Sequence, residues 1–309
     1  MAWTTTDLLA DVRRRAMLPT TATLGLADSD ILEHANNEMA TRLVPLVTSV
    51  NEEFYVQTVD ITCVAAQAAY RMPNRSAGAK LRDVTYLQGS SVQRLSRIEP
   101  ERLAQFTATP YGTPVGFYLE AGTINLVPAP SGGTLRMKYY VRPGRFTNTA
   151  TDYGTIATIT TNTATLFSGT FSGSLTTASV FDIIALRPPF EYLAIDAQQF
   201  TFSGANIALI GGATNLAPIS LNLAVGDYIC KTDKSPLIQL PVELHSLLIQ
   251  RTVCAIMETF NYSERLAAAE AAYERMEAAA LKLITPRVDG SPRKMRGILN
   301  TGRYGTGTR

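Results

Sequence analysis

The chain has 309 residues, 46% of them hydrophobic and 17% charged, which is long and apolar enough to bury one large core or two smaller ones. Its 28 basic and 26 acidic residues leave a formal net charge of +2, which excludes a surface dominated by phosphate neutralisation. Three widely spaced cysteines, Cys63, Cys230 and Cys254, indicate buried free thiols rather than a disulfide framework or a metal site. Because no stretch has the apolar length of a secretory signal or a membrane span, we expect assembly in the cytosol with no membrane partner.

Residues 1–50 predict two helices. Thr6 and Asp7 can cap the first, whose apolar residues share one face, and Pro19 should stop it. The second should begin at Asp28 to Asp30. Its inward positions are Leu32, Ala35, Met39, Leu43 and Leu46, at spacings of 3, 4, 4 and 3. Pro45 is predicted to kink or end this helix because it has no amide proton.

Residues 51–144 show the alternation of strands. Hydrophobic and polar residues alternate from about residue 54 to 63, and more clearly from Thr134 to Val141, which fits a sheet with one solvated face. Residues 118–120 and 124–126 flank Ala121 and Gly122, and glycine adopts the positive backbone angle of a tight turn. This pair predicts a hairpin.

Residues 145–235 are rich in Thr, Ser, Gly and Ala and poor in charge, with short β-branched runs between glycines. They predict an inserted β-rich domain. Asp182 and Asp227 are interpreted as strand-entry residues that bond their own backbone. The segment 169–173 has glycine at both ends, but its spacing is not that of a serine nucleophile elbow, and it is interpreted as a loop.

Residues 236–285 predict two long helices divided near Asn261. The first carries two apolar stripes and should be buried on more than one side. The second carries a heptad-like seam of six residues, Leu266, Ala269, Tyr273, Met276, Ala280 and Leu283. A seam this short is typical of packing within one chain, although contact between subunits remains open.

Residues 286–309 form a basic segment with a net charge of +5 and little apolar surface to bury. Such a composition predicts an extended arm that orders against a partner, or else a solvated terminus. The residues expected to make the contact are Arg287, Arg293, Lys294, Arg296, Arg303, Tyr304 and Arg309.

The sequence contains no phosphate-binding loop or dinucleotide fingerprint. Its two histidines, His34 and His245, lack the spacing of metal ligands, and His245 is interpreted as a surface or capping residue in the first turn of its helix. Paired carboxylates can meet from anywhere in a chain, but none stands out. We therefore expect no enzyme activity and no cofactor.

Several stretches resemble the head-to-tail adaptor proteins of tailed bacteriophages. They are Asp28 to Leu32 with Asn37 to Met39, Tyr111 to Pro114, Phe117 to Glu120, Ile124 to Pro130, Thr134 to Arg136, Tyr139 to Pro143, Leu240 to Leu248, and Pro286 with Arg287. The resemblance covers roughly 1–143 and 236–300. The β-rich segment between these ranges departs from a minimal adaptor.

The resemblance implies a ring, commonly of twelve subunits, that sits beneath the portal, extends the channel for double-stranded DNA and attaches a tail or nozzle protein. It also implies that the C-terminal arm reaches the portal. The expected fold is α+β, a discontinuous helical bundle formed by residues 1–50 and 236–285, with a β-sheet region at 51–144 and an inserted β-rich domain at 145–235. Ring contacts of this kind need two different complementary faces on each subunit.

Two other functions remain open from the sequence. One is a tail protein that binds a receptor or glycan through residues 145–235, although this segment has no tryptophan and its aromatic residues are set in apolar runs, which suits a core better than a sugar-stacking surface. The other is a cell-wall hydrolase that uses an unrecognised carboxylate pair, which a turnover assay on peptidoglycan would detect.

Overall fold

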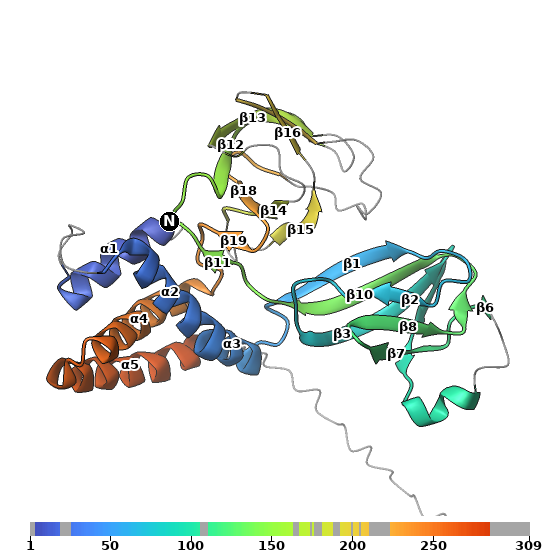
Figure 1. Ribbon diagram of the computed structural model, residues 1–309, viewed down its shortest axis with the longest axis horizontal. Helices are drawn as coiled ribbons and strands as arrows, with labels where there is room; N and C mark the ends of the chain where they lie inside the picture. Colours follow the sequence, from blue (N-terminus) through green and yellow to red (C-terminus); the bar gives the residue numbers. More distant parts are fainter. Residues whose placement is uncertain are drawn as a thin grey trace, which may run out of the picture.

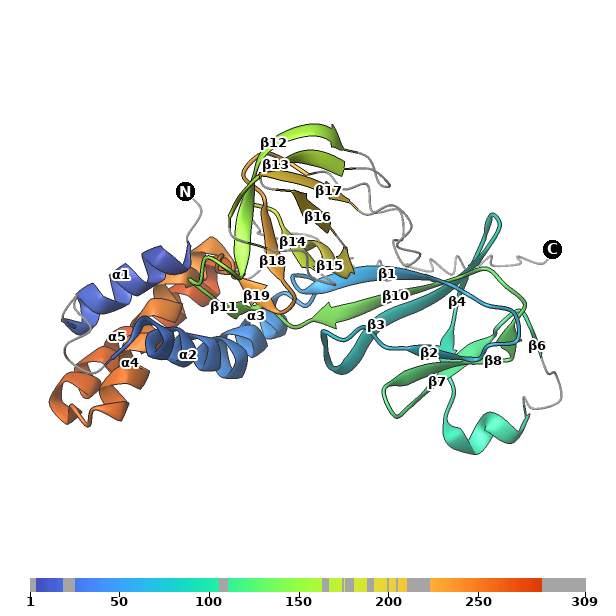
Figure 2. The same cartoon turned by 45° about the horizontal axis from the view of Figure 1, so that its top comes forward.

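Helices from both ends of the chain pack into one bundle at one end of an elongated molecule, and a β-sheet region occupies the other end (Figures 1 and 2). A third, β-rich part lies beside the place where the bundle and the β-sheet region meet. This computed structural model describes residues 4–18, 26–105, 111–162, 167–173, 175, 181–187, 192–198, 200–203, 205–209 and 223–284. The α+β class and the discontinuous bundle predicted from the sequence are confirmed.

The helical bundle joins two sets of elements far apart in the sequence. Its members are α1 Thr5–Ala16, α2 Asp28–Glu38, a π-helical turn Met39–Leu43, α3 Val44–Val50, a 3-10 turn Val242–Leu244, α4 His245–Thr259 and α5 Ser263–Ile284. Helix α4 packs against α1, α2 and α5, and eleven of its fifteen residues are buried. The prediction that this helix is buried on more than one side is therefore confirmed.

Helix α1 is capped two residues earlier than predicted. The hydroxyl of Thr4, not Thr6, accepts a hydrogen bond from the Asp7 amide at 3.3 Å, and the Asp7 carboxylate accepts one from the Thr4 amide at 3.0 Å. This reciprocal pair satisfies amide groups that the first turn leaves without helical partners.

The helix does not end at Pro45, because a π-helical turn, Met39–Leu43, comes just before it, and a kink there stays a prediction. In this wider turn the amide of Val44 bonds the Met39 carbonyl, and the helix continues to Val50. The extra residue also changes the buried face: Val47 is 1% exposed, whereas the predicted Leu46 is only partly buried.

The β-sheet region folds into two four-stranded sheets with its own apolar core. The strands of the first, in spatial order, are β1 Val56–Thr62, β10 Thr134–Val141, β3 Ser76–Gln88 and β4 Ser91–Arg94. Those of the second are β2 Ala69–Arg71, β8 Thr123–Val127, β7 Gly116–Glu120 and β5 Ser96–Arg97. A short pair, β6 Tyr111–Gly112 with β9 Ala129–Pro130, and a 3-10 turn, Pro100–Gln105, complete the region.

The predicted strand at 134–141 and the predicted hairpin are both present. Leu135 and Met137 are fully buried, as the alternation requires. Strands β7 and β8 pair in antiparallel register across Ala121 and Gly122, whose φ angles are 45° and 76°. These left-handed conformations suit a two-residue turn whose twist matches that of the strands.

The insert forms a seven-stranded sheet within the described residues. Its strands, in spatial order, are β15 Tyr192–Gln198, β14 Phe181–Ile184, β18 Tyr228–Lys231, β12 Tyr153–Asn162, β13 Phe167–Gly173, β17 Asn206–Leu209 and β16 Phe200–Ser203. A short parallel pair, β11 Arg145–Phe146 with β19 Lys234–Ser235, joins the two chain passages that connect the insert to the rest of the molecule.

The interpretation of 169–173 as a loop is wrong, because these residues are the end of β13. A Cβ atom on Gly169 would lie 2.1 Å from the Thr158 carbonyl oxygen of the paired strand β12. Glycine here permits close backbone approach within a sheet rather than a turn.

Candidate functional site

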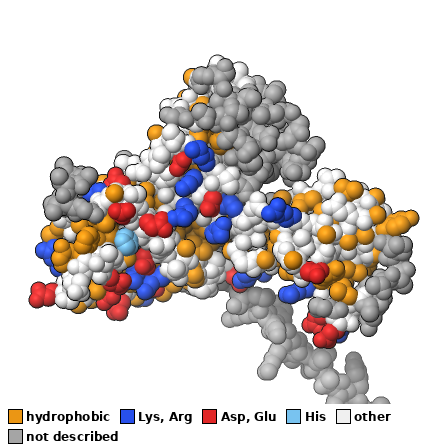
Figure 3. Space-filling view, viewed as in Figure 1, with side chains coloured by type: hydrophobic (Ala, Val, Ile, Leu, Met, Phe, Trp, Pro, Cys, Tyr) orange, Lys and Arg blue, Asp and Glu red, His pale blue; other side chains and the backbone are white. Residues whose placement is uncertain are grey.

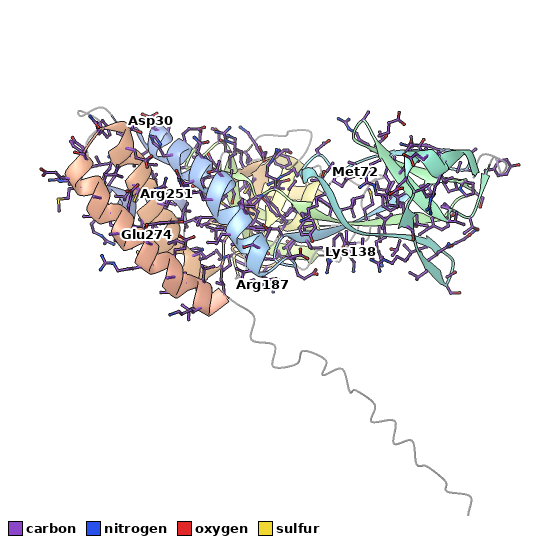
Figure 4. The ribbon with its side chains drawn as sticks, turned by 90° about the horizontal axis from the view of Figure 1, so that it is seen from below. Asp30, Met72, Lys138, Arg187, Arg251 and Glu274 are labelled. Atoms are coloured by element: carbon purple, nitrogen blue, oxygen red, sulfur yellow. The ribbon has the colours of Figure 1, made fainter. Side chains whose placement is uncertain are left out.

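The basic arm that the sequence predicts lies outside the described residues, from Arg287 to Arg309. The last described residue, Ile284, packs against the helical core. It ends α5 beside α3, as Figures 1 and 4 show from perpendicular directions. The segment 285–309 therefore starts at the side of the bundle that faces the β-sheet region.

The six seam residues of α5 do not share one environment. Ala269, Tyr273 and Ala280 are buried in the helical core, and Leu266 and Met276 pack partly against it. Leu283 is 71% exposed and lies outside the core formed by the described residues, whereas its neighbour Ile284 packs against that core. The seam therefore packs inside the subunit over five of its positions and leaves the sixth on the surface.

Arg251 of α4 fixes α2 and α5 on the same side of the bundle (Figure 4). Its side chain is 5% exposed and donates to the Glu38 carboxylate at 2.8 Å, while its guanidinium lies 5.8 Å from the Tyr273 ring centroid. Burial acts to lower the pKa of Arg251, but the hydrogen bond to Glu38 together with the charges of Glu38 and Glu258 outweighs it, and the pKa is raised overall. The charge is therefore retained inside the bundle.

A buried polar cluster joins the helical bundle, the β-sheet region and the insert. We call it the junction, and its members are Arg75, Asp182, Tyr192, Gln239 and Tyr55. Arg75 lies in the turn before β3 and is 2% exposed, whereas Asp182 of β14 is fully buried. Their side chains form an ion pair between two parts of the fold.

The other contacts of Arg75 complete the connection. Its guanidinium donates to the Tyr192 hydroxyl at 2.6 Å and to the Arg142 carbonyl at 2.7 Å. The Tyr192 hydroxyl donates to the side-chain oxygen of Gln239 at 2.6 Å. The backbone carbonyl oxygen of Gln239 accepts from the Tyr55 hydroxyl at 3.0 Å. One hydrogen-bonded chain thus runs from the insert to the segment that leads into α4.

Electrostatics keep the junction in a single charge state. Burial acts to lower the pKa of Arg75, but Tyr192 and Asp182 raise it, and the net pKa lies above the ordinary value. Burial raises the pKa of the Tyr192 hydroxyl, because it disfavours the charged phenolate. The hydroxyl therefore stays protonated and able to donate. The hydrogen bonds that connect these side chains favour one fixed geometry between the parts, although Arg75 Nε and Gln239 Nε2 make no hydrogen bond to the described residues.

The interpretation of Asp182 as a residue that bonds its own strand entry is wrong, because its carboxylate pairs with Arg75. Asp227 does bond nearby backbone: its carboxylate accepts from the Ala224 amide at 2.7 Å and from the Leu186 amide at 3.0 Å. These two aspartates therefore have different structural roles.

His245 is buried, contrary to its interpretation as a surface or capping residue. Its side chain is 1% exposed, and Nε2 lies 3.1 Å from the Leu240 carbonyl. Burial lowers the pKa of the imidazole, so folding favours the neutral ring.

This burial predicts a pH dependence of stability. Because the folded-state pKa lies below the unfolded value, the contribution is complete above about pH 6.5 and is lost as the pH falls below it, with a slope of at most about 1.4 kcal/mol per unit. Urea unfolding of the wild type and His245→Gln between pH 5 and 8 should show a steeper acid loss in the wild type. Equal slopes would contradict the assignment.

The three cysteines are buried free thiols, as predicted. Burial raises the pKa of the Cys63, Cys230 and Cys254 thiols, so none is poised as a thiolate. Across the described part of the chain, no group of three or more His, Cys, Asp or Glu residues is placed to hold a metal ion. None of the described helices is both long and apolar enough to span a bilayer.

A groove of about 510 Å³ lies beside the junction, between α2 and the segment 142–145. Its wall is apolar at Met39 and Val44, and its rim carries Asn37 and Arg142.

The sequence reasoning missed the junction. The one available signal was the position of Asp182, a charged residue between the buried apolar residues Phe181 and Ile183. A carboxylate in such a run is rarely left without a partner. Nothing in the sequence identifies Arg75 as that partner, because the two residues are 107 positions apart.

A helical bundle built from both chain ends, fixed to two β parts and ending in a basic segment, has the features expected of a structural virion protein, a bacteriophage head-to-tail adaptor. The family comparison agrees with this class. The model described as SU10 adaptor protein matches residues 3–166, just over half of the chain, and the chain belongs to this family. No curated protein matches the chain.

Proposed function

We propose that the chain forms a homo-oligomeric ring, of twelve subunits, that binds beneath the portal, extends the DNA channel and attaches a tail or nozzle protein. The family match over residues 3–166 is the observation that carries this proposal. The ring would be part of the virion at the head-tail interface and would assemble in the host cytoplasm.

The junction and the bundle support a structural role of this kind. An adaptor must hold its neighbours on both sides in a fixed relation. The buried contacts of Arg75 join different parts of this subunit, and those of Arg251 join helices within the bundle. Double-stranded DNA would pass through the ring without sequence-specific contact, which the formal net charge of +2 favours over tight phosphate binding.

For the portal, we propose docking through the C-terminal arm. The net positive charge of its six basic residues and one acidic residue complements an acidic portal surface, and Tyr304 adds an aromatic contact. Fully extended, residues 285–309 span at most about 85 Å, which is enough to reach a neighbouring component.

The arm is tested by mass measurements on the purified protein, alone and mixed with its portal. Deleting residues 286–309 should abolish the portal complex, because the deletion removes the proposed docking charges. Replacing Arg287, Arg293, Lys294 and Arg296 by glutamine should weaken the complex most strongly at low salt, because screening at high salt already reduces the attraction that these charges provide.

A matched control changes four exposed basic residues of the helical bundle to glutamine: Arg14, Arg265, Arg275 and Lys282. This variant loses the same amount of charge and should bind the portal as the wild type does. A wild-type protein that stays monomeric in the presence of its portal would overturn the proposed function.

A further inference from the structure

The end of the β-sheet region farthest from the bundle carries a surface that the bundle contacts do not use. We call it the distal tip, and it consists of residues 64–68, 88–92, 111–115 and 128–133. Four of its apolar side chains are strongly exposed: Val64 57%, Val92 66%, Tyr111 60% and Val115 47%. In Figure 3, hydrophobic side chains gather at this end of the molecule.

Backbone and side-chain contacts bring these four segments together. Tyr111 pairs with Ala129, and the Ala66 amide bonds the Pro130 carbonyl at 2.9 Å. The Val115 amide bonds the Val127 carbonyl at 2.9 Å, and Thr113 lies 3.3 Å from the Gln88 side chain, next to the turn that leads to Val92. The exposed residues therefore belong to one continuous end of the sheet region.

The distal tip is also free of charge. Residues 61–70, 84–93, 111–119 and 121–135 contain no Asp, Glu, Lys or Arg, although 17% of the whole chain is charged. Charged side chains occur only at its margin, for example Glu99, Glu101 and Arg102 around the 3-10 turn. An uncharged apolar centre with a polar margin is the organisation of a protein interface.

The exposed apolar residues of the bundle in a second copy would not match this surface. Among the described residues, a second exposed apolar group, Met17, Phe260 and Tyr262, lies in the helical bundle, at the end of α1 and in the turn between α4 and α5. It is surrounded by exposed charges, including Arg14, Glu258 and Glu264. Docking it against the distal tip would bury these charges without partners, which is unfavourable.

We propose that the distal tip is the docking surface for the tail or nozzle protein, and that it takes an uncharged, apolar face of that protein. The proposal rests on the adaptor function and adds the surface that the tail side would occupy. The subunit then has partner surfaces at separate places: the basic arm starts from the bundle, and the distal tip lies at the far end of the β-sheet region.

The test uses the full-length chain with Val92→Lys or Tyr111→Lys. Both side chains point to solvent, so the folded state should keep its stability within about 0.5 kcal/mol. Binding of the purified tail or nozzle protein of the same virion should fall at least about tenfold, because the introduced charge would be buried without a partner. Val225→Lys, at a valine 62% exposed on the insert, is the matched control and should bind normally.

Each outcome separates the two proposals. Portal binding that stays intact while tail binding is lost only in the tip variants supports the distal tip. Tip variants that bind the tail protein as the wild type does would overturn it. Wild-type chains that associate with each other in solution, and stop doing so in Val92→Lys, would assign the surface to a second copy and also overturn it. Failure of wild-type portal binding would refute the adaptor function itself.

Discussion

Replacing Asp182 by alanine is expected to destabilise the folded chain by about 3–5 kcal/mol, because it leaves the buried Arg75 guanidinium with only its longer, 3.6 Å ion pair to Asp233. Both side chains are almost inaccessible, at 2% and 0% exposure, so water cannot replace the lost carboxylate. Urea unfolding followed by circular dichroism measures the loss. Limited proteolysis of the passages between the insert and the bundle should become faster.

Two further variants decide whether burial is the cause. Arg136→Ala removes an exposed ion pair with Asp60, whose side chains are 40% and 19% exposed, and should cost no more than about 1 kcal/mol. The double change Arg75→Met with Asp182→Leu replaces the buried pair by apolar groups and should recover most of the stability lost in Asp182→Ala. A loss in Arg136→Ala as large as that in Asp182→Ala would contradict this account.

Replacing Leu248 by alanine should destabilise the chain by about 2–5 kcal/mol, because it leaves a cavity where α4 meets the other helices. Leu248 is fully buried at the centre of the bundle. Since this core joins helices from both ends of the chain, the variant should also form less ring at a given concentration. Thermal unfolding and mass measurements test the two effects separately.

Leu283→Ala is the matched control for Leu248→Ala, because it makes the same change in the same bundle. Leu283 is 71% exposed, so the change should alter stability by no more than about 0.5 kcal/mol. If Leu283→Ala leaves the monomer stable but prevents ring formation, Leu283 lies between subunits. Equal losses of stability in the two leucine variants would contradict the described packing of α5.

The parts of the fold that were predictable are those in which local pattern and packing agree. The alternation from Thr134 to Val141 identified a strand because one face is buried and the other is solvated. Local rules failed where tertiary structure overrode them. Pro45 was expected to end a helix, but the π-helical turn before it keeps the helix continuous. Gly169 was expected in a loop, but it permits close approach of two strands.

The site was less predictable than the fold. The α5 seam followed from heptad spacing, yet spacing alone did not decide between Leu283 and Ile284 in the last turn, where two adjacent apolar residues compete for one buried position. The Arg75 to Asp182 pair depends on how the insert is placed against the β-sheet region. Periodicity describes which face of an element is apolar, but not which distant residue will meet it.

The discontinuous bundle has a consequence for synthesis on the ribosome. Helices α1 to α3 are made first, but α4, the helix they pack against, begins only at His245. Until then the apolar faces of α1 and α2, including Leu8 and Ile31, have no α4 to cover them. The β-sheet region, with its own core, can fold before the bundle closes. A prematurely terminated chain would keep those faces exposed to chaperones and proteases, which would remove defective subunits before assembly.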